Sequence, residues 1–290
     1  MYLSRVWLKP EISKSSQLGR LLQSRTYGTH QLLWDLFSDS SRFLYREEVA
    51  GEQRVEHAGL KGAPIYYLLS EAAPAATVLF EVESRPFAPQ LRTGQRLAFK
   101  VRVNPVVTRQ KQRHDLVMDE QLRLFKELSQ CLGLPKGRNK KALKTELLEN
   151  KNAEALQEEL QRRLSGTSYA WALSDNPSAE CGLEMALRHS VTLRLGRWLA
   201  GNPSREGIFE LAQRTCEDPF NDTDFEVLDL QYTAYQKHSL PEKGRKAGFC
   251  SVDLSGELIV RDTERFIDML KQGIGPAKGF GCGLMMIKPA

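Results

Sequence analysis

A tyrosine and a histidine lie one helical turn apart near the N-terminus. Tyr27 and His30 are three positions apart within a segment, 27–37, whose apolar residues recur at helical spacing, so both side chains can share one face of a helix. The ordinary pKa of an imidazole is close to neutrality, and a phenol can donate a hydrogen bond, so the pair could perform general acid–base chemistry. A helical tyrosine and histidine can equally be packing residues, and the spacing alone leaves that alternative open.

A glycine-rich segment near the C-terminus is a second candidate. Residues 273–283 contain five glycines, with Lys278 among them. Glycine permits positive φ and close approach of the backbone to other groups, and consecutive N–H groups can hold a phosphate. The segment follows a predicted helix and lacks the P-loop and dinucleotide-binding signatures. A structural turn and a contact for an RNA backbone both remain open explanations.

The other histidines and the cysteines do not indicate a metal site. Five histidines and five cysteines are scattered along the chain, and none has the spacing of a zinc or metalloprotease motif. An odd number of dispersed cysteines also argues against a disulfide framework and indicates a reducing compartment. The first eight residues are too short and too interrupted for a secretory signal, and no apolar run approaches the about 18 residues of a membrane span. We therefore expect a cytoplasmic protein that uses no metal, cofactor or membrane.

Basic residues are gathered in three runs, although the net charge is only +5. The runs are Lys100, Arg102, Arg109, Lys111 and Arg113; Lys136, Arg138, Lys140, Lys141 and Lys144; and Lys237, His238, Lys243, Arg245 and Lys246. Clustered cations attract a phosphate backbone and release its counterions. Any one run could be a solvated face, but three runs favour a polyanionic partner.

The elements that would position these residues alternate between strands and helices. Strands are predicted at 1–8, 43–49, 65–69, 77–82 and 95–107, with the helix at 27–37 between the first two. This order is typical of a ferredoxin-like βαββαβ domain whose second helix is weak. A long strand at 225–235, a hairpin at 249–260 turning at Ser255-Gly256, a helix at 263–272 with Asp262 as its N-cap, and a strand at 284–287 suggest a second such unit.

The middle of the chain differs from both ends. Residues from about 120 to 200 read as leucine-rich helices, broken by a basic turn near 133–141, and residues 207–214 read as a further helix. We therefore predict an α+β protein with two tandem ferredoxin-like (RRM-like) domains, at 1–115 and 116–290, and a helical insertion in the second half. The insertion could grip nucleic acid, act as a lid or subunit contact, or be a plain structural addition.

Four segments resemble the CRISPR RNA-processing endoribonucleases of the CasE family. They are Met1-Tyr2-Leu3-Ser4, Tyr27-x-x-His30 with Leu33-Trp34-x-Leu36-Phe37, Arg102-x-Asn104-Pro105, and the glycine-rich stretch from Gly273 to Leu284. The glycine-rich stretch is the most specific of the four. The resemblance covers about 1–118 and 200–290, which leaves about 120–195 as an insertion relative to the usual shorter family member.

The resemblance implies metal-independent cleavage of CRISPR repeat RNA beside a stem-loop. The ribose 2′-OH attacks the phosphate, leaving a 2′,3′-cyclic phosphate and a 5′-OH, and the protein keeps the crRNA as a subunit of a Cascade-type effector complex. His30 and Tyr27 match the family's catalytic residues. RNA contacts would come from Arg102, Lys237, Lys243, Arg245, Lys246 and Lys278, and from the loop at Gly275, Gly279 and Gly281. One histidine cannot be both acid and base in one protonation state, so a second group or water must assist.

A non-catalytic subunit that binds an RNA hairpin is the alternative. In that case the same fold holds RNA and His30 is only a packing residue. A substrate with a 2′-deoxyribose at the cleavage position separates the two, because an enzyme binds it without cutting it.

Overall fold

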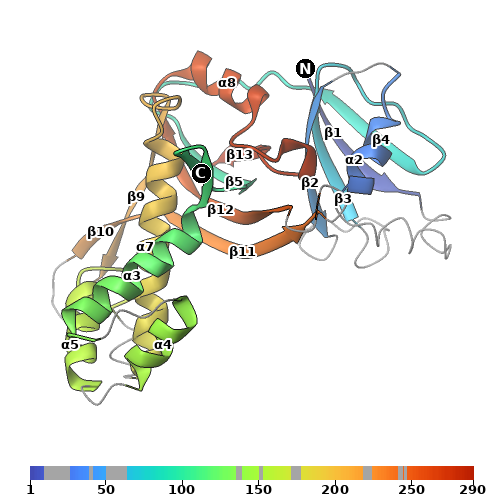
Figure 1. The fold of residues 1–290 in the computed structure, drawn as a ribbon. Helices are drawn as coiled ribbons and strands as arrows, with labels where there is room; N and C mark the ends of the chain where they lie inside the picture. The colour runs from blue at the N-terminus through green and yellow to red at the C-terminus, as the bar shows by residue number, and fades with distance from the viewer. Residues whose placement is uncertain are drawn as a thin grey trace. The chain divides into compact units, whose positions relative to one another are not determined.

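The computed structural model describes residues 1–9, 27–38, 42–49, 64–134, 139–149, 153–170, 178–217, 224–240, 244 and 247–290 (Figure 1). The chain divides into two compact units. The sheet unit comprises Met1–Asn104, Thr233–Ser255 and Val260–Pro289, and the helical unit comprises Pro105–Tyr232 and Gly256–Ile259. Within the described ranges, no helix has both the length and the apolar character needed to cross a membrane.

The first sheet has the ferredoxin-like strand order. Its strands are β1 (Tyr2–Leu8), β2 (Phe43–Val49), β3 (Pro64–Ser70) and β4 (Phe80–Pro86), and helix α2 (Tyr27–Trp34) connects β1 to β2. The strands lie in the order β2-β3-β1-β4, and each neighbouring pair is antiparallel. Residues 71–79 are all described and form no helix, so the second helix of the βαββαβ pattern is absent here. The predicted weakness of that helix is confirmed.

Period-two alternation on β1 explains how this sheet builds its core. Val6 and Leu8 are buried on the face that Ser4 shares, while the residues between them are more exposed, because successive strand residues point to opposite faces. Leu33 on α2 and Leu36 just after it pack in the same cluster as Val6 and Leu8. This packing fixes α2 on one face of the sheet.

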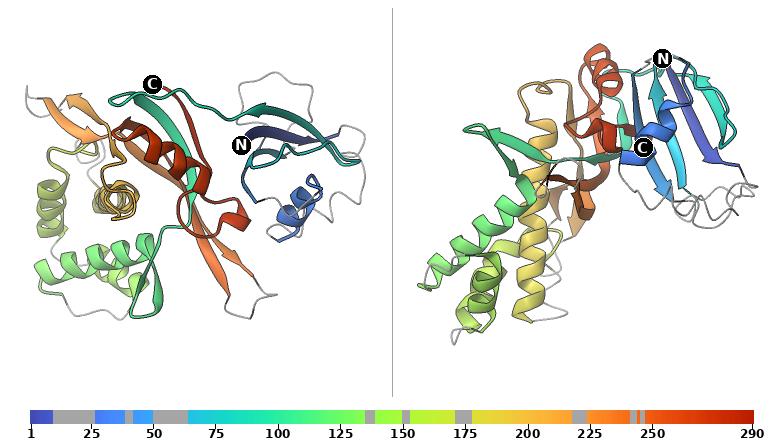
Figure 2. Two further views of the ribbon diagram at one scale, coloured as in Figure 1. Left: turned by 90° about the horizontal axis from the view of Figure 1, so that it is seen from above. Right: turned by 45° about the vertical axis from the view of Figure 1, so that its right-hand side comes forward.

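The second sheet repeats the strand order of the first. Its strands are β5 (Arg96–Val103), β11 (Leu230–Ser239), β12 (Gly248–Val260) and β13 (Met285–Pro289), with α8 (Thr263–Gln272) between β12 and β13. They lie in the order β11-β12-β5-β13, and β8 (Phe209–Leu211) also pairs with β12. In both views of Figure 2, α8 lies beside this sheet. Asp262 caps α8 as predicted, accepting a hydrogen bond from the Arg265 N–H at 3.0 Å.

The strand at 96–103 does not belong where we expected it. We placed it within an N-terminal domain at 1–115, but β5 lies between β12 and β13 in the second sheet, with Val101 opposite Met285. Alternating hydrophobicity identifies a strand without naming its partners, which is why the sequence alone assigned it to the wrong sheet. The prediction of two tandem ferredoxin-like domains is confirmed by the strand order of the two sheets.

Three predicted elements in the second half are wrong. Residues 225–235 form two strands, β10 (Asp224–Leu228) and β11, rather than one, and residues 207–214 contain β8 and the start of β9 (Gln213–Glu217) rather than a helix. The predicted hairpin at 249–260 is the single strand β12. A Cβ on Gly256 would lie only 1.9 Å from the Asp229 carbonyl oxygen. Gly256 therefore allows a neighbouring backbone to come close, and it does not mark a turn.

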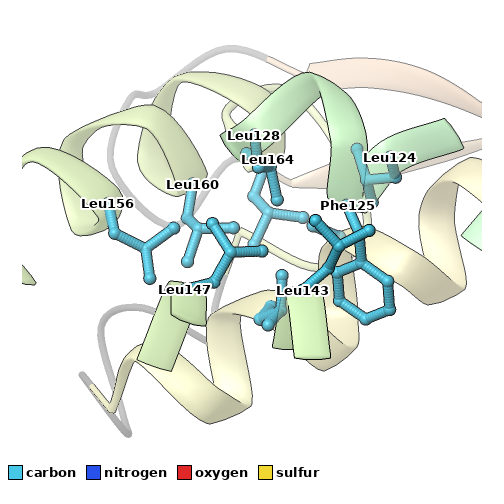
Figure 3. Close-up of a cluster of buried hydrophobic side chains, with 10 residues drawn as sticks. Leu124, Phe125, Leu128, Leu143, Leu147, Leu156, Leu160 and Leu164 are labelled. Carbon is cyan, nitrogen blue, oxygen red and sulfur yellow. The ribbon is translucent and has the colours of Figure 1, made fainter. Parts of the chain in front are cut away.

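The helical unit has its own hydrophobic core. It contains β6 (Val106–Arg109), β7 (Gln112–Asp115), α3 (Leu116–Cys131), α4 (Lys140–Leu148), α5 (Ala153–Leu164) and α7 (Ala179–Ala200), besides β8, β9 and β10. Leucines from α3, α4 and α5 interdigitate with Leu183 and Ala186 of α7 (Figure 3). Side-chain caps from Asp115, Asn139 and Ser178 begin α3, α4 and α7. The predicted helical insertion at about 120–200 is confirmed.

Truncation of a core leucine should destabilise the helical unit. Leu160 is fully buried in the cluster of Figure 3, so Leu160→Ala loses buried apolar surface and leaves a cavity, which should cost about 3 kcal/mol. Urea unfolding of the full-length protein, followed by far-UV circular dichroism, measures the change. Glu158→Ala on the exposed face of α5 is the control and should change stability by less than about 0.5 kcal/mol. Equal effects would show that the cluster is not a tightly packed core.

Candidate active site

His30 lies on the flank of α2, half-buried beside an aromatic group on β2. Its imidazole is stacked on the Phe43 ring, with centroids 5.0 Å apart and planes inclined by 19°. One turn further along α2, the Trp34 ring lies 5.4 Å from the imidazole, the distance expected of i, i+4 neighbours. Burial lowers the pKa of His30 below its ordinary value. The side chain is therefore held in one place, is partly open, and favours its neutral form at pH 7.

Tyr45 places a second aromatic ring next to the imidazole. Phe43 and Tyr45 are two residues apart on β2, so they point to the same face of the sheet, and both are buried. The Tyr45 ring lies 6.1 Å from that of His30, and its hydroxyl donates a hydrogen bond to the Gly279 carbonyl at 3.4 Å. Burial raises the pKa of the Tyr45 phenol far above neutrality, so it stays protonated and keeps its donor.

The glycine-rich loop closes over these rings. A Cβ on Gly279 would lie 3.7 Å from His30 Nε2, and a Cβ on Gly281 would lie 3.2 Å from Tyr45 Cε2. Gly281 also has a φ of +78°, which favours glycine. At its ends the loop is tied together and to β5, because the Ile274 N–H donates to the Gly283 carbonyl at 2.9 Å and the Gly283 N–H to the Arg102 carbonyl at 2.7 Å. The loop backbone can thus approach both rings.

A buried ionic network connects the two sheets beside the loop. Arg46 of β2 is 1% exposed. It donates to Glu48 at 2.9 Å, and its Nη2 lies 3.6 Å from Asp253 of β12. Asp253 accepts two hydrogen bonds of 2.9 Å from the Arg102 guanidinium. Lys100 lies 3.1 Å from the other carboxylate, Glu48. Two acids therefore hold three cations, one on β2 of the first sheet and two on β5 of the second.

An aromatic stack extends from β11 to the glycine-rich loop. The His238 ring stacks on Phe249 at 4.5 Å, and Phe249 stacks on Phe280 at 5.0 Å. His238 Nε2 also forms a 2.7 Å hydrogen bond with the Ser251 hydroxyl. Burial, followed by the charge of Arg102, lowers the pKa of His238. This histidine is ordered by its neighbours rather than simply solvated.

Some of the predicted site residues lie at His30, some already have partners in the protein, and some are only partly described. The loop residues Gly275, Gly279, Gly281 and Lys278 share the sheet unit with His30, and Gly279 lies against its imidazole. Lys278 is half-buried, and burial together with the charge of Arg42 lowers its pKa.

Arg102 and the backbone N–H of Gly281 already have partners within the protein. Arg102 is paired with Asp253. The Gly281 N–H donates to the Lys278 carbonyl at 3.3 Å, so in this conformation it holds the turn rather than offering a donor to a ligand.

The remaining predicted residues are only partly described. Lys237 is exposed on β11, and Tyr27 begins α2, but its side chain lies outside the described part of the structure. Lys243, Arg245 and Lys246 also lie outside the described residues.

Sequence reasoning missed the residues that support the site. Phe43, Tyr45 and Asp253 carry no motif, and each acts through a partner distant in the chain. The only signal was that Phe43 and Tyr45 recur at strand spacing, which indicates a shared face but not what that face contacts.

Comparisons with known proteins converge on one family. A family model described as "CRISPR associated protein" matches residues 1–289. The CRISPR system Cascade subunit CasE of Escherichia coli K12 is 41% identical over 46 residues, which are 16% of this chain and 23% of that protein. The aligned segment therefore spans less than a quarter of that relative.

Solved structures match over nearly the whole chain. Thermus thermophilus Cse3 bound to an RNA representing a pre-cleavage complex has a TM-score of 0.53 and 20% identity, covering 99% of this chain and 98% of that one. A CRISPR endoribonuclease Cse3 bound to a 19-nt RNA has a TM-score of 0.50 and 19% identity, with both chains fully covered. At this identity the likeness establishes a shared fold.

Neutralising Asp253 should destabilise the sheet unit. Asp253→Asn keeps the size of the side chain but removes the charge that faces Arg46 and Arg102, and breaking a buried pair should cost about 3 kcal/mol. Urea unfolding at neutral pH measures this. Asp268→Asn, which breaks an exposed pair with Lys271, should change stability by less than about 1 kcal/mol. Similar values for both variants would show that the network does not stabilise the unit.

Proposed function

Because this chain belongs to the CRISPR-associated protein family whose model it matches over residues 1–289, we propose that it is a metal-independent endoribonuclease that cleaves CRISPR repeat RNA beside a stem-loop. The partial match to the Cascade subunit CasE and the fold shared with RNA-bound Cse3 support the choice of substrate. The product is a mature crRNA, which the protein retains as one subunit of a Cascade-type complex in the cytoplasm.

The observation that carries this proposal is the half-open imidazole of His30 against the backbone of Gly279. Since the residue at 279 has no side chain, nothing from that position covers His30 Nε2, which would lie 3.7 Å from a Cβ there. Lys278, the preceding residue, brings a cation to the same loop. A proton acceptor on α2 against this loop, and a cation within the loop, suit attack by a ribose hydroxyl on a phosphate.

The reaction needs one bond to form and one to break. The 2′-oxygen bonds to phosphorus while the bond from phosphorus to the 5′-oxygen breaks, which leaves a 2′,3′-cyclic phosphate and a 5′-OH. Neutral His30 accepts the 2′-OH proton, and the Lys278 ammonium balances the charge that develops on the phosphate oxygens. The leaving 5′-oxygen takes a proton from water or from a second group. Tyr27, at the start of the same helix, would position the ribose or the phosphate.

The RNA stem would bind along the second sheet. Lys237 is exposed on β11, and Lys243, Arg245 and Lys246 follow in the segment that connects β11 to β12. Such a basic segment reads the shape and phosphates of an A-form helix, because the major groove is too narrow for side chains to read the bases. Arg102, held by Asp253 on the adjacent strand, would contribute a fixed positive charge near this path.

Removing the imidazole should abolish cleavage but not binding. His30→Ala and the more conservative His30→Gln should each lower the single-turnover cleavage rate of a labelled repeat hairpin by about 10²–10⁴-fold, with EDTA in excess throughout. The hairpin's Kd should change little. His189→Ala, which alters a histidine of the helical unit, is the control. Cutting by His30→Gln at the wild-type rate would remove His30 from the mechanism, and loss of wild-type cutting in EDTA would exclude the metal-independent reaction.

The pH dependence should place His30 as a base. Its pKa is lowered from 6.5 by burial, and a base acts in its neutral form, so the cleavage rate should rise with pH through the lowered pKa and level off above it. Single-turnover rates from acidic to mildly alkaline pH measure the midpoint of this limb. The midpoint should lie below 6.5 and should be unchanged in His189→Ala. A midpoint above 6.5 would contradict a base with a lowered pKa.

A further inference from the structure

The helical unit contains a second cationic site, in a part of the molecule that the proposed reaction does not use. A cavity of about 650 Å³ is lined by side chains of β6, α3 and α7, and only one of them, Leu122, is apolar. Its volume falls in the range of about 300–1,000 Å³ that holds a drug-sized ligand. Sites for small organic ligands are mostly apolar, so this lining indicates a different class of ligand.

The amphipathic pattern of α3 produces the cavity. Leu124, Phe125 and Leu128 face the leucine core of the unit, and Arg123 and Lys126 line the cavity from the opposite side of the helix. Since residues 3–4 positions apart share a helix face, the core packing itself forces the basic residues outward. α7 supplies Arg194 and Arg197, and Arg109 enters from the end of β6.

One of the two acidic residues of the lining is already paired with an arginine. Glu120 is buried and accepts hydrogen bonds from Arg123 at 2.6 and 3.0 Å and from the Ser190 hydroxyl at 2.5 Å. These bonds outweigh the effect of burial and lower the Glu120 pKa, so the carboxylate stays charged and committed to Arg123. Asp119, the other acid, lies 3.4 Å from His114 Nδ1.

Four described cations of the cavity make no direct bond to an acid, although the charge of Arg194 helps to lower the pKa of Glu120. In the part of the chain that the structure describes, no hydrogen bond or salt bridge engages the side chain of Arg109, Lys126, Arg194 or Arg197. Three of them are exposed and Arg194 is half-exposed. Like charges gathered in one concave site repel one another, so an anion that enters gains from every one of them.

We infer that this cavity binds the phosphate backbone of a nucleic acid at a site separate from the catalytic loop. Guanidinium groups pair with phosphate oxygens through two parallel hydrogen bonds, and three of the four cations are arginines. A protein partner is disfavoured, because the core of a protein interface is depleted of charge and rich in aromatic groups.

The cations extend beyond the cavity, which favours a polymer over a single phosphate. The β6–β7 turn holds Gln110 and Lys111 at φ values of +48° and +63°, a conformation that glycine or asparagine usually adopts, and it presents Lys111 and Arg113 to solvent. A hydrogen bond from Lys140 to Gln121 ties the lysine-rich start of α4 to the same helix that lines the cavity. Further cations therefore lie on two elements connected to the lining, the turn after β6 and the start of α4.

A paired set of variants tests the inference in the full-length protein. Arg194→Gln/Arg197→Gln removes two cations of the cavity. Arg162→Gln/Arg188→Gln removes two exposed arginines of the same unit that are paired with Glu159 and Glu184. Each protein is first saturated with a repeat hairpin carrying a 2′-deoxyribose at the cleavage position. Binding of a labelled mixed-sequence DNA duplex and of a labelled unstructured RNA is then measured by fluorescence anisotropy over a range of salt concentrations.

The cavity variant should bind at least one probe about tenfold more weakly. The slope of log K against the logarithm of the salt concentration should also be smaller in magnitude by about 2, which is about one unit for each lost phosphate contact. The control should stay within about twofold of the wild type. The probe that loses more affinity identifies DNA or RNA as the source of the backbone. Equal losses for both probes indicate recognition of the phosphates alone.

Three results would overturn the inference. The first is failure of the wild-type protein to bind either probe, which would leave an acidic protein surface as the occupant. The second is an equal loss of probe affinity in the two variants, which would show that only net charge matters. The third is loss of both hairpin cleavage and probe binding in the cavity variant, which would assign the two arginines to binding of the hairpin. Hairpin cleavage at the wild-type rate shows that the variant is folded. It also separates this test from that of the proposed reaction, which depends on His30.

Discussion

The candidate site depends on how closely a backbone can approach two aromatic rings. Gly279 lies against the imidazole of His30, and Gly281 lies against the ring of Tyr45. The Tyr45 hydroxyl then holds the Gly279 carbonyl. A side chain larger than a methyl group at 279 would fill the space next to Nε2, and any side chain at 281 would meet both the Tyr45 ring and an unfavourable φ. The absence of side chains thus keeps a catalytic candidate open while the loop stays ordered.

An ionic network supports the strands that carry these rings. Arg46, Asp253 and Arg102 connect β2 to β12 and β5 through a network in which each carboxylate meets more than one cation. Buried ion pairs add little net stability over apolar packing but strongly penalise the loss of one partner. Such a network therefore holds β2, which carries two of the rings, in position against β5 and β12.

Features that depend on neighbouring residues could be predicted from the sequence, and contacts between residues far apart in the chain could not. The Tyr27–His30 spacing, the glycine-rich loop, the Asp262 cap and the leucine-rich helices all follow from neighbouring residues, and the structure contains the helix, the loop, the cap and the insertion. The partners of β5, the close approach at Gly256 and the roles of Tyr45 and Asp253 depend on residues far apart in the chain. Propensity and periodicity carry no information about such pairs, so β5 was assigned to the wrong sheet and β12 was read as a hairpin.

The leucine core of Figure 3 also affects how long the connection that contains it can be. The helices that contain it lie in the connection between β5 and β11, where the βαββαβ pattern has a single helix. Lengthening a connection costs little, about 0.6 kcal/mol for each doubling, and a segment with its own interior brings its own folding energy. The connection between β5 and β11 can therefore be long without an equal loss of stability, because it has a core of its own.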